Sequence, residues 1–169
     1  MQKGKGVFIL FLTLASISSL PILSSCQNLS QIEEVVNPVL EKPELVKALR
    51  TVYLKGISNV NVKETQKGLE ITIPDNLLFN GNDIYTINGS GTKILRKIMQ
   101  LYKDEIVRGY PDNVITVVGE DTNGEDRGKK KAGTVAKFIK TYNVSDENLF
   151  WYGKKTNTNQ IKIYIDLEK

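Results

Sequence analysis

The sequence has no histidine, one cysteine and little net charge, and each of these shortages excludes a class of function. Histidine is the commonest general base and metal ligand, so its absence excludes histidine-dependent triads and zinc hydrolases. A single cysteine excludes an internal disulfide, so the fold depends on an ordinary hydrophobic core. The chain carries 23 basic and 19 acidic side chains, and residues 1–25 hold two of the lysines and no acid. The remainder has a net charge of +2, which does not predict nucleic-acid binding.

Residues 1–25 have the layout of a secretory signal peptide. A short segment with two lysines precedes an apolar stretch over residues 7–22. Serine, threonine and proline interrupt this stretch, whereas a membrane-spanning helix needs ~20 apolar residues in a row. The stretch ends in Leu23-Ser24-Ser25-Cys26, which resembles the bacterial lipobox. The resemblance implies cleavage between Ser25 and Cys26 and acylation of Cys26. The alternative is a buried core cysteine that follows an ordinary signal peptide or a membrane helix.

Acylation of Cys26 predicts a protein that is anchored to a membrane without spanning it. Each buried methylene contributes roughly 0.8 kcal/mol, so several acyl chains hold the protein on the membrane essentially permanently. Gln27, directly after the cysteine, resembles the sorting signal of outer-membrane cargo. We therefore expect a lipid anchor in the outer membrane, a domain that faces the periplasm, and no cofactor or metal other than the covalent lipid.

Residues 26–58 read as the lipidated cysteine and a tether, because Pro38 and Pro43 forbid one continuous helix. A short helix is predicted from Pro43 to Tyr53, since proline is favourable in a first helical turn. Its predicted inner side is formed by Leu45, Leu49 and Val52. Such a helix either packs on its own domain or docks a partner.

Residues 59–169 read as one globular domain. Apolar residues alternate with polar ones across Lys67-Gly68, which predicts a hairpin. The apolar run over 114–118 is typical of a central strand covered on both faces. The other predicted elements are helices over 90–108 and 129–142, a turn over 80–83, and strands over 149–152 and 161–167. This order predicts an α/β (α+β) two-layer sandwich, a mixed sheet of about four to five strands with two main helices on one face.

These elements carry a resemblance to the OmpA-like domain. Residues 68–79 resemble its opening, in which a strand ends in a leucine-phenylalanine pair before a turn and a long helix. Residues 114–119 resemble its central strand and glycine, Lys131-Ala132 with the apolar positions that follow resembles its second helix, and Tyr152-Gly153 resembles the end of its third strand. The resemblance covers residues 60–167. Together with the lipobox it resembles the peptidoglycan-associated lipoproteins, and in layout the small OmpA-like lipoprotein of Dot/Icm type IV secretion systems.

The resemblance implies a pocket for the peptide stem of peptidoglycan. In that family an aspartate after the central strand holds the ammonium of a diaminopimelate, and an arginine at the start of the second helix holds its carboxylate. In this chain the pattern falls on Asp121, Thr122, Asn123, Arg127 and Lys131. Asp121 takes the acidic role only if one position is deleted, and otherwise Thr122 stands there. The chain also departs from the pattern, because Glu120 replaces a histidine, the loop is shorter, and Lys131 replaces the arginine, whose planar two-pronged grip lysine cannot reproduce.

Each of these features has a structural alternative. Asp121 can cap a turn with Asn123 and Gly124. The lysines at 129–131 suit a solvated helix start as well as a binding patch. The aromatic residues of 149–152 suit a half-buried strand better than a ligand platform.

Three functional hypotheses follow. The first is a non-enzymatic scaffold that links the outer membrane to peptidoglycan. The second is a structural subunit of an envelope machine, such as the outer-membrane core of a type IV secretion system, in which the peptidoglycan pocket is vestigial and the partners are proteins. The third, an enzyme, has little support, because no motif places a nucleophile beside a base.

Overall fold

The computed structural model describes residues 38–168. The predicted signal peptide, the cleavage site, Cys26 and the first part of the predicted tether lie outside the described residues. In chain order the elements are α1 (Lys42–Ala48), η1 (Leu49–Tyr53), β1 (Asn61–Glu64), β2 (Gly68–Pro74), α2 (Asp75–Leu78), β3 (Phe79–Asn80), β4 (Asp83–Ile87), α3 (Gly89–Leu101), η2 (Tyr102–Ile106), α4 (Val107–Gly109), β5 (Val114–Asp121), α5 (Glu125–Lys140), η3 (Asp146–Asn148), β6 (Leu149–Lys155) and β7 (Gln160–Asp166). Within the described part, no helix combines the length and the apolar character that a bilayer crossing needs.

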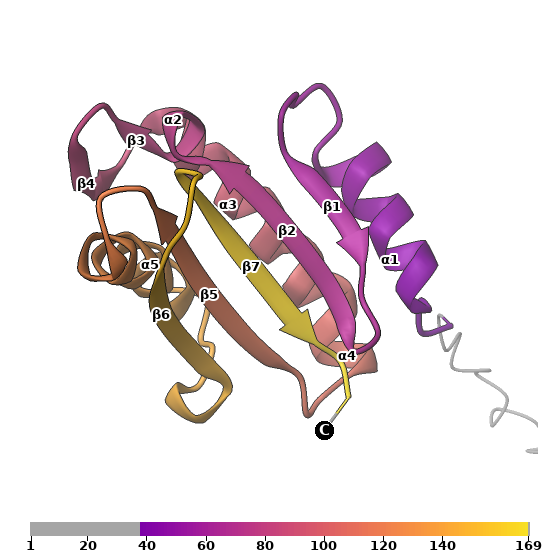
Figure 1. The fold of residues 1–169 in the computed structure, drawn as a ribbon. Coiled ribbons are helices and arrows are strands. Elements are labelled where there is room, and N and C mark those ends of the chain that lie inside the picture. Colours follow the sequence, from indigo (N-terminus) through magenta and orange to yellow (C-terminus); the bar gives the residue numbers. More distant parts are fainter. Residues whose placement is uncertain (1–37, 169) are drawn as a thin grey trace, which may run out of the picture. The chain divides into compact units, whose positions relative to one another are not determined.

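Five strands form one mixed sheet in the order β1-β2-β7-β5-β6 (Figure 1). All neighbours are antiparallel except β5 and β6, which run parallel. The predicted hairpin is confirmed as β1 and β2, with Val62 opposite Ile71. Strand β5 has neighbours on both sides as predicted, although β7 is the middle strand. The short β3–β4 ribbon forms a separate two-stranded sheet.

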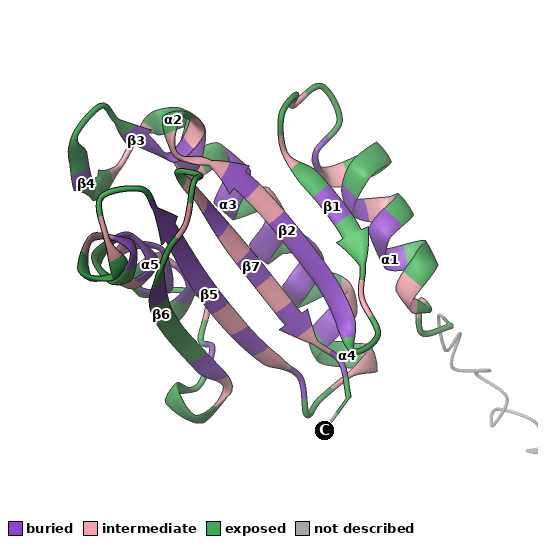
Figure 2. Ribbon diagram, viewed as in Figure 1, coloured by how far each residue is buried: buried purple, intermediate pink, exposed green. Residues whose placement is uncertain are grey.

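The hydrophobic core lies between this sheet and the helices that cover one of its faces, so the predicted two-layer α+β sandwich is confirmed. Ile161, Ile163 and Ile165 of β7 point into the core, and the residues between them are half-buried on the opposite face (Figure 2). Thr116 of β5 is likewise only half-buried. Val118, on the same face as Thr116, is buried. The prediction that residues 114–118 are covered on both faces is therefore confirmed at Val118 and wrong at the start of the strand, because no layer of helices covers the second face.

The first helix belongs to the folded domain. Glu41 and Glu44 form a capping box at its start, and Leu45 and Leu49 are fully buried in the core. The predicted boundary at residue 59 is therefore too late, and the alternative in which this helix packs on its own domain is the one observed. Val52, predicted on the inner side, is exposed. Its turn is π-helical, and this wider turn rotates Val52 away from the side of Leu49.

Three glycines allow the first turns of α5 to pack directly on the backbones of β5 and β6. A Cβ on Gly128 would lie 2.2 Å from the carbonyl oxygen of Gly119, and a Cβ on Gly119 would lie 1.9 Å from that of Gly128. A Cβ on Gly153 of β6 would lie 2.0 Å from the carbonyl oxygen of Glu125. No side chain fits at these distances. The contact therefore sets where α5 begins relative to the carboxyl end of β5.

This close approach predicts that Gly128→Ala destabilises the domain by about 1–3 kcal/mol, because helix and strand must move apart. Gly89→Ala is the matched control, since a Cβ there meets nothing within 4 Å in another helical first turn. Urea unfolding of both variants measures the difference. Equal stability of the two variants would contradict the packing described.

Candidate functional site

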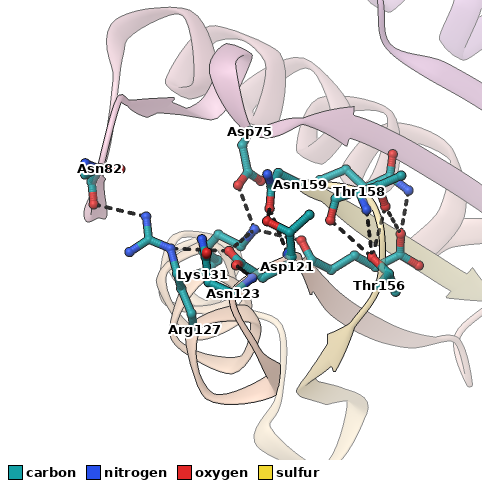
Figure 3. Close-up of polar contacts among 12 residues, drawn as sticks. Asp75, Asn82, Asp121, Asn123, Arg127, Lys131, Thr156, Thr158 and Asn159 are labelled. Atoms are coloured by element: carbon teal, nitrogen blue, oxygen red, sulfur yellow. Dashed lines mark hydrogen bonds and ion pairs between the residues drawn. The ribbon is translucent and has the colours of Figure 1, made fainter.

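The ammonium group of Lys131 is the centre of a buried charge cluster (Figure 3). Its side chain is fully buried, and Nζ lies 2.6 Å from Oδ2 of Asp75 and 2.8 Å from Oδ2 of Asp121. Nζ also donates to the carbonyl oxygen of Glu120 at 2.7 Å. An ammonium has three N–H groups, so all of its donors are used. Lys131 thereby joins α5, the end of β5 and the start of α2.

Asp121 is 1% exposed and holds the β5–α5 loop in place. Its Oδ1 accepts from the backbone N–H of Asn123 at 2.7 Å, which is the turn-capping role that the sequence offers as an alternative. Its Oδ2 faces Lys131 and lies 3.3 Å from Nε of Arg127. Burial alone raises the pKa of Asp121, but the bonds from Lys131 and Asn123 outweigh it and lower that pKa below its usual range. Asp121 is therefore ionised, and its oxygens are engaged within the protein.

Asp75 is the carboxylate with spare capacity. Its Oδ2 pairs with Lys131, whereas Oδ1 is buried and has no hydrogen-bond partner among the described residues. Burial raises the pKa of Asp75 above its usual range, and the hydrogen bond and ion pair with Lys131 only partly offset that effect. A buried acceptor without a partner is costly, so an N–H donor from a ligand would stabilise it. Asp75 follows Pro74, far along the chain from the other site residues, and no local pattern in the sequence marks it as one of them.

Arg127 in the first turns of α5 reaches across to the β3–β4 ribbon. Its Nε faces Asp121, and Nη2 donates to the carbonyl oxygen of Asn82 at 3.4 Å. The side chain is 33% exposed, so part of the guanidinium remains open to solvent. Since a guanidinium carries five N–H groups in a fixed fork, donors remain for an anion.

A cavity of about 620 Å³ lies over this cluster. Its lining consists of Asp75, Asn76, Phe79, Asn80, Gly81, Asn82, Asp121, Asn123, Arg127 and Asn159. Three of the predicted candidates therefore line the cavity, namely Asp121, Asn123 and Arg127. Lys131 does not line it and is buried among the carboxylates.

Thr122, another of the predicted site residues, does not line the cavity. Its backbone N–H and its hydroxyl both donate to Oδ1 of Asn159, at 3.0 and 3.2 Å. This contact ties the β5–α5 loop to the β6–β7 loop. The same contact holds Asn159 at the rim of the cavity. Asn159 lies in a polar loop, and the local sequence does not distinguish it from an ordinary turn residue.

Glu120, which stands in place of the family histidine, does not line the cavity. Its carboxylate accepts from Gln160 at 2.6 Å and from Thr158 at 2.9 Å, and pairs with Lys162 at 2.8 Å. Burial raises the pKa of Glu120, but these three contacts outweigh it and lower the pKa. Glu120 therefore orders the loop that carries Asn159.

The four charged side chains of the cluster sum to zero, because Asp75 and Asp121 are balanced by Arg127 and Lys131. Such a site has no strong preference for a simple cation or anion. The same cavity is lined by a carboxylate residue, Asp75, with an unpartnered oxygen and by the partly free guanidinium of Arg127, which suits a ligand that carries both an ammonium and a carboxylate.

No family model and no curated protein matches this sequence. Solved structures match its fold. The cell wall anchor of the T6SS from Pseudomonas aeruginosa aligns with a TM-score of 0.61 at 14% identity, over 76% of this chain and 100% of that one. The periplasmic domain of Helicobacter pylori MotB aligns with a TM-score of 0.57 at 16% identity, over 66% of this chain and 83% of that one. An outer membrane protein from Borrelia burgdorferi B31 aligns with a TM-score of 0.50 at 16% identity, over 65% of this chain and 97% of that one. The chain therefore has the OmpA-like fold, as its sequence predicts.

The cluster predicts that Lys131→Met destabilises the domain by about 3–5 kcal/mol at neutral pH, because the buried carboxylate of Asp121 and the half-buried one of Asp75 lose their shared counter-charge. The lowered pKa of Asp121 stabilises the folded state above the unfolded carboxyl pKa of about 3.9, and this contribution is lost as the pH falls through the folded pKa. The deficit of the variant therefore shrinks in acid. Thermal unfolding across pH measures it, with Lys93→Met on exposed α3 surface as the control. A pH-independent deficit would contradict the assignment.

Proposed function

We propose that this protein is a non-enzymatic scaffold of the bacterial envelope, an outer-membrane lipoprotein whose periplasmic OmpA-like domain binds the peptide stem of peptidoglycan. The observation that carries the proposal is the cavity that is lined by both Asp75, whose Oδ1 has no hydrogen-bond partner among the described residues, and Arg127, whose side chain is 33% exposed. The solved structures of the same fold include a protein described as a cell wall anchor, which supports a role at the cell wall.

The chemistry of the stem peptide fits this cavity. A diaminopimelate in the stem carries an ammonium and a carboxylate on the far carbon of its side chain, so it presents both charges close together. In our account the ammonium binds Asp75, and the carboxylate binds Arg127 with help from the amide side chains at the rim. Asp121 and Lys131 position these two residues and do not contact the ligand.

A catalytic role is disfavoured by the state of the charged groups. Lys131 gives all three of its N–H groups to acceptors inside the protein and is fully buried, so it is not available as a nucleophile or base. Asp121 is similarly engaged through both oxygens.

The anchor in this proposal is the acylated Cys26. Eleven residues lie between Cys26 and residue 38, where the described part begins. A fully extended chain of that length reaches at most about 40 Å. The domain is therefore held close to the membrane surface, at a distance that suits a link between that membrane and nearby peptidoglycan.

One observation favours the second candidate function, a structural subunit of an envelope machine with a vestigial pocket. The Lys131 ammonium already occupies the gap between Asp75 and Asp121, where an ammonium from a ligand would otherwise sit. If this internal cation satisfies the site, the domain keeps the fold without its ligand, and its partners are other proteins, such as those of a type IV secretion outer-membrane core.

Sedimentation of residues 27–169 with purified peptidoglycan separates the two functions. Saturable binding is expected for the native protein, and Asp75→Asn and Arg127→Gln are each expected to weaken it by about tenfold or more, because a charge-assisted hydrogen bond contributes roughly 1.5–3 kcal/mol. Binding should also fall as the pH drops toward the raised pKa of Asp75, since a protonated carboxyl no longer attracts an ammonium.

The matched control is Arg96→Gln, which removes the same charge from exposed surface on α3. Equal binding by the native protein and both site variants, or binding that salt abolishes in all of them, would contradict the wall-linker function. It would leave the vestigial pocket as the better account.

The anchor predicts that the full chain carries acyl groups on Cys26 and sediments with the outer membrane. Cys26→Ser should abolish labelling by radioactive palmitate and release the protein from the membrane fraction, because no other cysteine is present. Unchanged membrane association of this variant would contradict the lipid anchor.

A further inference from the structure

Strand β6 forms one edge of the main sheet, and its outer side is unprotected. It pairs with β5 on one side, and among residues 38–168 no strand pairs with the other. An edge strand presents unpaired backbone N–H and C=O groups that can template pairing with another chain. Natural proteins usually blunt such edges with charges, proline, bulges or a covering segment. The segment Leu149-Phe150-Trp151-Tyr152 has none of the first three.

The opposite edge of the same sheet is protected. Strand β1 carries exposed polar residues at Asn61, Lys63 and Glu64. Helix α1 lies beside it (Figure 1), and Arg50 donates to the backbone carbonyl of Val62. Residues 149–152 of β6 carry no charges of this kind, so the first half of β6 is the more open edge.

The aromatic residues of β6 are exposed on both faces of the strand. Phe150, Trp151 and Tyr152 are 52%, 43% and 49% exposed. Successive side chains in a strand point to opposite faces, so three consecutive half-exposed aromatics mean that neither face is covered at this edge. Trp151 lies on the helix side, where a Cβ on Gly133 of α5 would be 3.4 Å from the indole nitrogen. The sequence favours a half-buried strand position for these aromatics, but the structure leaves all three about half-exposed at the edge of the sheet.

The charges that flank this segment are opposite at its two ends. Glu147 precedes it, and Lys154 and Lys155 end it. All three are exposed, and none of them forms an ion pair among the described residues. An antiparallel arrangement of two such strands brings the acidic end of one to the basic end of the other. A uniformly acidic partner would instead meet Glu147 with repulsion.

We propose that β6 pairs antiparallel with β6 of a second copy of this chain, in a register centred on Trp151. This register places Phe150 opposite Tyr152 across the two-fold axis. It also brings Glu147, which lies in η3 just before the strand, to the end of the partner's β6 that carries the lysines. Opposed residues share a face, so the two sheets continue into one sheet with the helices of both copies on the same side. The contact is isologous and closes on itself, which gives a dimer and no open-ended fibre.

Other registers fit less well. Centring the pair on Tyr152 sets Phe150 against Lys154 and Trp151 against Gly153, which loses the aromatic pairs. Aromatic pairs and opposite charges are the cross-strand contacts that stabilise an antiparallel pair most. The centred register provides both.

Sedimentation equilibrium of residues 27–169 tests the dimer and its register. This fragment retains the whole described core and lacks the only cysteine, so disulfide dimers cannot arise. We expect a reversible monomer–dimer equilibrium. Lys155→Glu should raise its dissociation constant by about tenfold, because two symmetry-related attractions become repulsions. The double variant Glu147→Lys/Lys155→Glu should restore it. Lys55→Glu, an equal change at an exposed turn, should leave it unchanged.

Fluorescence gives a second readout, because Trp151 is the only tryptophan. Its emission should move to shorter wavelength as the protein is concentrated, and the midpoint should shift with Lys155→Glu. A monomer at every concentration up to about 1 mM would overturn the proposal. So would a dimer that the double charge exchange fails to rescue, or one with unchanged Trp151 emission. None of these results depends on peptidoglycan binding.

Discussion

The buried ammonium of Lys131 is the interaction on which the site depends. It joins segments that are far apart in the sequence, because α2 supplies Asp75, β5 supplies Asp121 and α5 supplies the lysine itself. Without this cation the buried carboxylate of Asp121 and the half-buried one of Asp75 would repel each other, so Lys131 permits both to remain charged. With Lys131 in place, Asp121 can orient Arg127 and the Asn123 turn. The position of the residues that line the cavity therefore depends on the ion pairs that Lys131 forms with Asp75 and Asp121.

The backbone packing beneath the cluster explains why a lysine reaches this point. Gly119 and Gly128 bring α5 against β5 so closely that no Cβ fits between them. Lys131 lies one turn further along α5, and its long side chain extends along the helix toward the carboxyl end of β5. A lysine cannot replace an arginine where the planar guanidinium must bind an anion with two N–H groups. Here the lysine acts as a compact point charge between carboxylates, and Arg127 supplies a partly exposed guanidinium from the preceding turn.

Local patterns in the sequence predict much of this fold and part of the site. Alternation identifies β1, β2 and β7, and helical spacing identifies α3 and α5. The sequence does not reveal that the domain begins before residue 59, because Leu45 and Leu49 have the same pattern whether they pack against their own domain or a partner. Asp75 was missed because its role depends on contact with Lys131, which no local pattern encodes. The exposure of the β6 aromatics was missed because strand composition does not tell an edge from a centre.

The most direct test of the central claim is a titration of the backbone amide resonances of residues 27–169 with a soluble stem peptide that contains the diamino acid. The account predicts saturable shifts confined to the cavity lining, around Asp75, Asn82, Asn123, Arg127 and Asn159, and weakened by Asp75→Asn. Shifts that are absent at saturating peptide, or that map to the exposed sheet face or to β6, would contradict a ligand site built around Asp75 and Arg127.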